Sequence, residues 1–118
     1  MVKENPLEEK SKSFALRIVK AYVFLRDKKS ETVMSKQLLR SGTSIGANIA
    51  EAQYAQSRAD FGTKMSIALK EASETRYWIQ LLVSSGFLSE NQTTLSLVRE
   101  CSELISLLVP TVRKTKKD

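Results

Sequence analysis

Two pairs of glutamates have a spacing that could gather carboxylates on one side of a helix. They are Glu71 with Glu74 and Glu100 with Glu103, and Glu51 adds a fifth carboxylate in an apolar segment. Four-helix bundles can hold pairs of metal ions with glutamates, but that construction also uses Glu-x-x-His on two helices. The chain contains no histidine, so both pairs read Glu-x-x-Glu. We therefore expect solvated helix faces here, with neither a metal ion nor any other cofactor.

Other catalytic arrangements also lack their components. Because it contains no histidine, the chain lacks the commonest general base and cannot form a Ser-His or Cys-His arrangement. The single cysteine, Cys101, has apolar neighbours at helical spacing and no base to activate it, which indicates a core residue. Gly42 and Gly46 lie within a helical pattern instead of after a strand, as a phosphate-binding loop would require. The sequence predicts a protein that is not an enzyme.

The positive charge is concentrated at the two ends of the chain, which has a net charge of +6. Residues 1–30 contain eight Lys or Arg and four acids, residues 31–112 contain seven and eight, and residues 113–118 contain four and one. This segregation indicates attraction for polyanions, with RNA or DNA as the first choice and an anionic membrane as the second. The alternative is that the charged ends serve only solubility. The candidate nucleic-acid-binding residues are Lys10, Arg17, Lys20, Lys28, Arg113, Lys114, Lys116 and Lys117.

The chain has no apolar run long enough to cross a bilayer, and its first residues lack the apolar stretch of a signal peptide. A lone cysteine fits a reducing compartment. We therefore expect a cytoplasmic protein without a membrane partner.

Apolar residues at helical spacing predict an all-α chain. The pattern places helices at about residues 8–28, 33–54, 58–85 and 90–112, within a single domain over 1–118 that ends in the basic tail 113–118. Short connections between helices of this length force neighbours to run antiparallel, which predicts an up-down-up-down four-helix bundle. Capping boxes at Ser57 and Ser89 mark the starts of the third and fourth helices, and Gly86 stops the third.

The first helix has more apolar surface than one bundle core requires. Its predicted core stripe contains Phe14, Ile18, Tyr22 and Leu25, and a neighbouring arc contains Leu16, Val19 and Val23. Large exposed apolar patches usually mark interfaces, so we expect self-association. The predicted core stripe of the fourth helix contains Leu95, Val98, Cys101, Ile105 and Leu108, and Pro110 is expected to end or kink that helix.

The second helix is interrupted by a glycine-rich run whose conformation is open to two interpretations. Two internal glycines cost about 1 kcal/mol each relative to alanine, which favours a turn. However, Gly42, Gly46 and Ala50 recur every four residues, and such a stripe allows another helix to pack closely. We favour a continuous helix.

Polar and aromatic side chains on the second and third helices could form a further site. The polar residues can share a helix face, as a hydrogen-bonded network between helices or subunits, or alternatively as contacts to a ligand or RNA. They are Arg40, Thr43, Ser44, Asn48 and Glu51. Tyr77 and Trp78 are more typical of a core or a subunit interface than of a platform on which bases stack.

The same stretch resembles a known family. Residues 35–52, SKQLLRSGTSIGANIAEA, are similar to the signature of the four-helix-bundle proteins encoded in intervening sequences of bacterial 23S rRNA genes. The resemblance continues through residues 59–61 and 64–78, and includes residues 13–15, Ile18 and Val19, so that it covers roughly residues 10–90.

This resemblance implies a homo-oligomer, specifically a homopentamer, of unknown biological function and without known enzymatic activity. The related accessory variability determinant proteins of retroelements are similar pentamers that are basic enough to bind nucleic acid and that partner a reverse transcriptase. By resemblance, a structural or interface role falls to Arg40, Gly42, Thr43, Ser44, Gly46, Asn48, Glu51, Tyr77 and Trp78. The leading hypothesis is a homo-oligomer that binds RNA or DNA through basic surface rows. The alternative is a scaffold for a protein partner.

Overall fold

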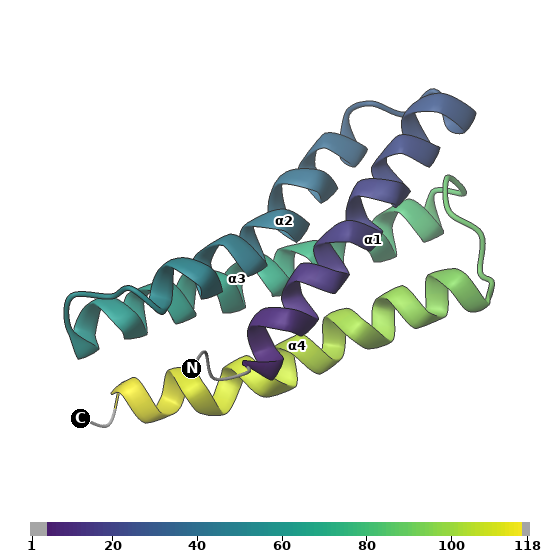
Figure 1. Ribbon diagram of the computed structural model, residues 1–118. Coiled ribbons are helices and arrows are strands. Elements are labelled where there is room, and N and C mark those ends of the chain that lie inside the picture. The colour runs from purple at the N-terminus through teal and green to yellow at the C-terminus, as the bar shows by residue number, and fades with distance from the viewer. Residues whose placement is uncertain (1–4, 117–118) are drawn as a thin grey trace.

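The computed structural model describes residues 5–116 and contains four helices joined by short connections. The helices are α1 (Pro6–Lys29), α2 (Met34–Ala52), α3 (Arg58–Ser84) and α4 (Gln92–Lys116), and residues 5–116 contain no strand. Each helix runs antiparallel to the one before it (Figure 1). The prediction of an all-α chain with four helices is therefore confirmed.

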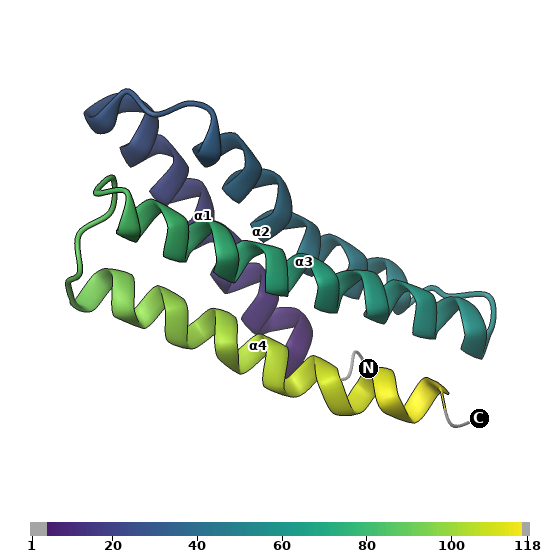
Figure 2. The ribbon, with the colours of Figure 1, turned by 180° about the vertical axis from the view of Figure 1, so that it is seen from behind.

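The first helix packs mainly on α2 and contacts α4 much less extensively. Seen from either side, α1 and α4 are close near the start of α1 and diverge toward its C-terminal end (Figures 1 and 2). Asn5 begins α1 by accepting a hydrogen bond from the backbone N–H of Glu8, at 3.2 Å. Ser30 ends it in the left-handed conformation, with φ of 54°. One side of α1 therefore stays uncovered along its second half.

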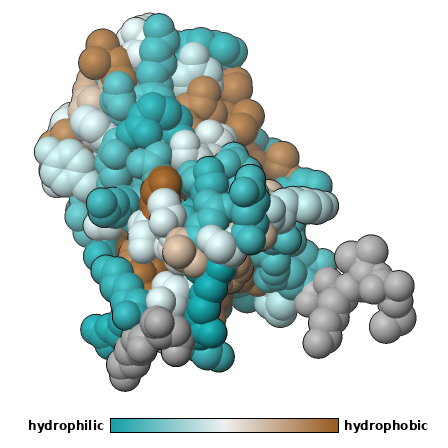
Figure 3. Space-filling view, turned by 90° about the vertical axis from the view of Figure 1, so that its left-hand side faces the viewer, coloured by the Kyte–Doolittle hydropathy of each residue, from teal (hydrophilic) through white to brown (hydrophobic). Residues whose placement is uncertain are grey.

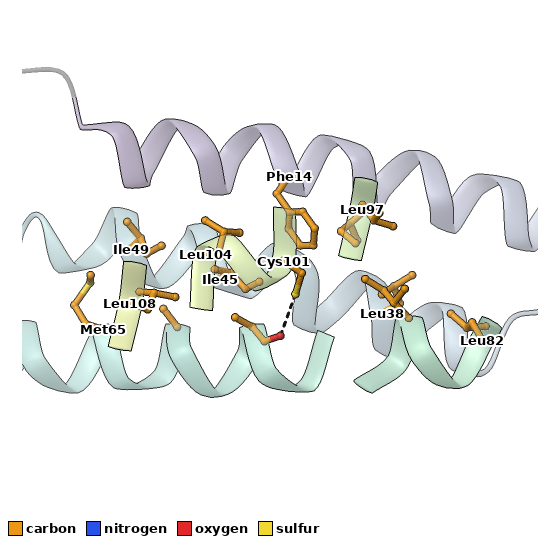
Figure 4. Packing of buried hydrophobic residues seen from close by; sticks show 14 of the residues in the cluster. Phe14, Leu38, Ile45, Ile49, Met65, Leu82, Leu97, Cys101, Leu104 and Leu108 are labelled. Carbon is orange, nitrogen blue, oxygen red and sulfur yellow. Dashed lines mark hydrogen bonds between the residues drawn. The ribbon is translucent and has the colours of Figure 1, made fainter. Parts of the chain in front are cut away.

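The core is built from apolar side chains of all four helices. Phe14 and Ile18 of α1 are fully buried, as are Leu38 and Ile45 of α2. In Figure 4 the ring of Phe14 points from α1 toward Cys101 of α4. Tyr22, predicted for the core stripe, is only half-buried, because it lies at the edge of the α1 face where the guanidinium of Arg26 stacks over its ring.

The glycine-rich run of α2 is helical throughout, so the competing prediction of a turn is wrong. A Cβ built at Gly42 would lie 2.8 Å from both γ-carbons of Ile18, and one at Gly46 would lie 3.3 Å from the Oγ of Ser11. The two glycines thus allow α2 to pack closely on α1, and at Gly42 the separation leaves no room for a Cβ. The close packing predicted from their spacing is confirmed.

The start of α2 depends on Glu31, a carboxylate that is only 8% exposed. Its side chain accepts hydrogen bonds from the backbone N–H groups of Val33, Met34 and Ser35, at 3.3, 3.1 and 2.8 Å. Burial alone would raise the pKa of Glu31, but these backbone donors outweigh that effect and lower it. An ionised carboxylate therefore satisfies the free donors of this helix end.

The predicted ends of the third helix agree with its structure. Ser57 accepts a hydrogen bond from the backbone N–H of Asp60 at 3.0 Å, as its capping box predicts. After Ser84 the chain leaves the helix through Gly86, whose φ of 85° is a conformation that glycine adopts readily.

The fourth helix differs from its prediction at both ends. Its start is capped by Asn91, whose Oδ1 accepts from the backbone N–H of Thr94 at 2.9 Å, and not by Ser89. Pro110 does not end it, because the helix continues to Lys116. Pro110 is exposed, so the carbonyl that loses its partner can face water. Residues 113–116 of the predicted tail are therefore helical.

The buried stripe of α4 is also rotated from the predicted one. Cys101 and Leu108 are buried as predicted, but Leu95 is 52% exposed. Val98 and Ile105 are only partly buried against the core. The residues that face the other helices are Thr94, Leu97, Cys101, Leu104, Leu108 and Val112. No helix in the described part of the chain is long and apolar enough to cross a membrane.

Candidate nucleic-acid interface

Two of the basic residues predicted to bind nucleic acid are engaged with glutamates of α4. Lys10 lies 3.3 Å from a carboxylate oxygen of Glu103. Arg17 forms an ion pair with Glu100 and donates to the Oγ of Ser96 at 2.9 Å and to the carbonyl of Thr93 at 3.0 Å. These contacts join α1 to α4. Arg17 is held within the bundle by these contacts, whereas Lys10 and Glu103 form an exposed surface pair.

The remaining basic residues of this set lie at two places. Lys20 and Lys28 are exposed on α1 and form no ion pair with another described residue. Arg113, Lys114 and Lys116 are exposed in the last turn of α4. Lys117 lies outside the described residues. The structure thus leaves one short basic row on α1 and a basic cluster at the end of α4.

The uncovered side of α1 is apolar, as the width of its apolar arc predicts. Leu16 is 59% exposed, and Val19, Val23 and Phe24 are exposed to lesser degrees. Beside this row a pocket of about 420 Å³ opens between α1 and the start of α4. Apolar side chains of Ala21, Phe24, Leu88 and Leu97 form part of its lining, with Lys20 at its border.

The end of the molecule where α2 meets α3 has a different character. Its space-filling view is largely hydrophilic, with separate hydrophobic patches (Figure 3). An open groove of about 310 Å³ lies where the first turns of α3 approach the last turn of α4. Lys70 and Lys116 border it from the two helices. Spacing along the sequence offered no signal for this juxtaposition.

Arg40 connects α2 to α3 through two carboxylates. Its guanidinium lies 2.8 Å from Oε2 of Glu71 and also forms an ion pair with Glu74. The indole N–H of Trp78 donates to Glu74 at 2.8 Å. The hydrogen bond from Trp78, and then that from Arg40, lower the pKa of Glu74, and the same ion pair raises the pKa of Arg40.

The predicted polar network of α2 is only partly present within one chain. Glu51 crosses to α3, where its carboxylate lies 2.9 Å from Nζ of Lys64. Thr43, Ser44 and Asn48 instead donate to carbonyls one turn back on α2, at 2.7, 2.6 and 2.8 Å. Short polar side chains in a helix often satisfy themselves in this way. Within one chain, these three therefore do not connect α2 to another helix.

A buried polar contact between α2 and α3 was missed. The hydroxyl of Thr75 lies 2.9 Å from that of Ser41, and both residues are fully buried. Ser41 lies within the glycine-rich motif, on the side of α2 that also contains Leu38 and Ile45. This position on the helix was the sequence signal that could have predicted its burial.

The two aromatic residues late in α3 have different environments. Tyr77 is 55% exposed, whereas Trp78 is half-buried and packs against the core. Their rings meet edge to face, with centroids 5.2 Å apart. Trp78 thus has a structural contact, and Tyr77 presents its ring to the surface.

The carboxylates considered as metal ligands form ion pairs with basic side chains. Glu51, Glu71, Glu74, Glu100 and Glu103 each form an ion pair with Lys or Arg. Among residues 5–116, His, Cys, Asp and Glu form no group of three or more that could hold a metal ion.

Cys101 lies in the core, as predicted. Its Sγ is 3.3 Å from the carbonyl oxygen of Ala72 (Figure 4). Burial raises the pKa of the thiol to about 12, so the nucleophilic thiolate is scarce near neutral pH.

Comparisons with known proteins agree with the motif of α2. The family model described as 23S rRNA-intervening sequence protein matches residues 3–109. A crystal structure of a protein with unknown function, from the S23 ribosomal protein family of Bacteroides thetaiotaomicron, is 50% identical with a TM-score of 0.87. The match covers 90% of this chain and 97% of that chain. No curated protein matches the sequence.

Proposed function

The chain belongs to the family of 23S rRNA-intervening sequence proteins, and we propose that it is a non-enzymatic homo-oligomer that binds RNA or DNA phosphates. The observation that carries this proposal is the segregation of charge. Residues 31–112 are almost neutral, whereas the two flanking segments hold all of the excess positive charge. Basic clusters on a near-neutral body supply the sequence-independent part of nucleic-acid binding.

The binding residues in this proposal are the candidate cations without a glutamate partner. Lys20 and Lys28 supply a row on α1, and Arg113, Lys114 and Lys116 supply a cluster at the end of α4. Lys10 and Arg17 contribute less, since their ion pairs with Glu103 and Glu100 must be broken or shared. Each site is weak alone, so binding depends on repetition.

Self-association supplies that repetition in the proposal. The exposed row of Leu16, Val19 and Val23 on α1 is the surface that a second copy covers, and the resemblance to pentameric relatives favours a homopentamer. Five copies of each basic cluster then bind one strand with an effective affinity far above that of a single cluster.

The test is binding of a fluorescent single-stranded 20-nucleotide RNA, and of DNA of the same sequence, followed by anisotropy at several salt concentrations. Affinity should fall steeply as salt rises, because phosphate contacts release counterions. Glutamine at Lys20, Lys28, Arg113, Lys114 and Lys116 should abolish binding, while Lys12→Gln with Lys36→Gln should preserve most of it. Unchanged RNA and DNA binding by the variant with all five substitutions would refute the assignment of these residues as the binding cations.

A protein-binding scaffold is the second candidate. It is favoured by the apolar pocket between α1 and α4, together with the exposed Tyr77 on α3. Capture of one protein partner in high salt, lost in the variant Phe24→Ser, would support it if the protein also failed to bind RNA and DNA at low salt.

A further inference from the structure

The first turns of α3 and the last turn of α4 form a groove that the basic-row prediction did not include. Gly62 of α3 is buried against Thr115 of α4, and a Cβ at Gly62 would lie 2.8 Å from the hydroxyl oxygen of Thr115. The absence of a side chain therefore allows the end of α4 to lie directly against the start of α3. This contact brings together residues that are far apart in the sequence.

The groove beside this contact is lined by cations from both helices and by no carboxylate among the described residues. Lys70 comes from the second turn beyond Gly62, and Lys116 from the last turn of α4. Neither lysine forms an ion pair with another described residue. Arg58 also borders the groove but takes part in an interaction of its own, so Lys70 and Lys116 are the residues on which the inference depends.

A neutral donor and the space of the groove complete this arrangement. Ser66 lies one turn before Lys70 on the same side of α3 and makes no hydrogen bond with another described residue, so its hydroxyl can donate to a ligand. The groove has a volume of about 310 Å³ and is open to solvent. Two ammonium groups and a hydroxyl donor around an open groove suit the oxygens of a phosphate in a polymer that passes along it.

We propose that this α3/α4 groove binds the phosphodiester backbone of RNA or DNA, with Lys70 and Lys116 as its cations. The inference rests on the proposed function and deepens it, because it names one site on the surface. The groove recognises phosphates rather than bases, so it binds strands of any sequence. The Gly62–Thr115 contact sets the separation between its two walls.

The test uses the full chain and the same labelled 20-nucleotide RNA and DNA. The double variant Lys70→Gln/Lys116→Gln should bind about tenfold more weakly and lower the slope of log affinity against log salt by about 1.4, or 0.7 for each lost phosphate contact. The control variant Lys12→Gln/Lys36→Gln removes the same net charge from α1 and α2. It should bind at least five times more tightly than the groove variant, because it keeps the phosphate contacts of the groove. Thermal melting checks that both variants fold.

A neutral substitution tests the geometry independently of charge. Gly62→Ala forces Thr115 to move and should weaken RNA binding about threefold to tenfold, whereas Gly46→Ala, which does not line the groove, should not. Equal affinities for the groove variant and its control would overturn the inference and leave the proposed function standing. If the wild-type protein bound neither RNA nor DNA, both the proposed function and this inference would be refuted. Displacement of RNA by poly-glutamate at equal charge concentration, with the same dependence on Lys70 and Lys116, would assign the groove to acidic protein segments and overturn the inference.

Discussion

Gly42 of α2 lies directly against the side chain of Ile18 of α1, at a separation that leaves no room for a methyl group. A Cβ at Gly42 would lie 2.8 Å from two carbons of Ile18, and Ile18 is fully buried. A buried, β-branched side chain cannot turn away cheaply. The close packing of α1, which has the exposed apolar row, on α2, which has the family motif, therefore depends on Gly42.

Gly42→Ala should lower the free energy of unfolding. Alanine favours a helix over glycine by about 1 kcal/mol, but overpacking costs about 1–3 kcal/mol, so we expect a net loss of up to about 2 kcal/mol. Gly46→Ala is the matched control, since its Cβ would meet the Oγ of Ser11 at 3.3 Å, and it should change stability by less than about 1 kcal/mol. Urea unfolding measures both values. An alanine at position 42 that stabilises the protein would contradict the packing.

The capping carboxylate Glu31 should make stability depend on pH. Because its pKa is lowered in the folded state, its contribution is fully present above the unfolded value of 4.5 and is lost as pH falls through the lower folded value. Glu31→Gln should cost about 1 kcal/mol at pH 7, as loss of a helix cap does. The difference between wild type and variant should shrink below pH 4.5. A difference that stays constant down to pH 3 would show that ionisation of Glu31 is not involved.

Trp78 can report the ionisation of Glu74, because its indole donates to that carboxylate and it is the one tryptophan of the chain. Its fluorescence should change with a midpoint below 4.5, the usual value for a glutamate. Arg40→Gln removes the second group that lowers this pKa, so the midpoint should rise. A midpoint that does not move in this variant would contradict the Arg40–Glu74 contact.

Cys101 should be unreactive while the protein is folded. Its thiol is buried, and its pKa is raised to about 12, so a disulfide reagent at pH 8 should find neither access nor thiolate. The same reagent should modify one thiol per chain in denaturant. Rapid modification of the native protein would contradict the burial of this residue.

Most of the buried face of the first helix could be predicted from the sequence, whereas that of α4 could not. Phe14 and Ile18 recur at helical spacing on α1, and the basic residues Lys10 and Arg17 border their stripe on one side. On α4, Val98 and Ile105 lie beside the buried Leu97 and Leu104, so the apolar arc is wide and helical spacing alone does not identify its buried centre. The prediction that Pro110 ends or kinks the helix did not foresee that α4 continues past it. Pro110 lies on the exposed side of the helix, where water can replace the lost backbone hydrogen bond.

The candidate site could be predicted only as a set of charges. Lys10 and Arg17 occur at the spacing of a basic stripe, but their partners Glu103 and Glu100 come from a helix more than eighty residues away. Likewise, Lys70 and Lys116 border the same groove because Gly62 allows the end of α4 to lie against the start of α3. Pairing between distant helices decides which cations are available, and the helical period within one segment contains no information about it.

The most direct test of the central claim is the native mass of the purified protein, measured by native mass spectrometry with and without a 20-nucleotide RNA. We predict a homo-oligomer, five times the 13.3 kDa mass of one chain, and an added mass of RNA that dissociates as salt is raised. A monomer of 13.3 kDa that gains no mass with RNA or DNA at low salt would contradict the account.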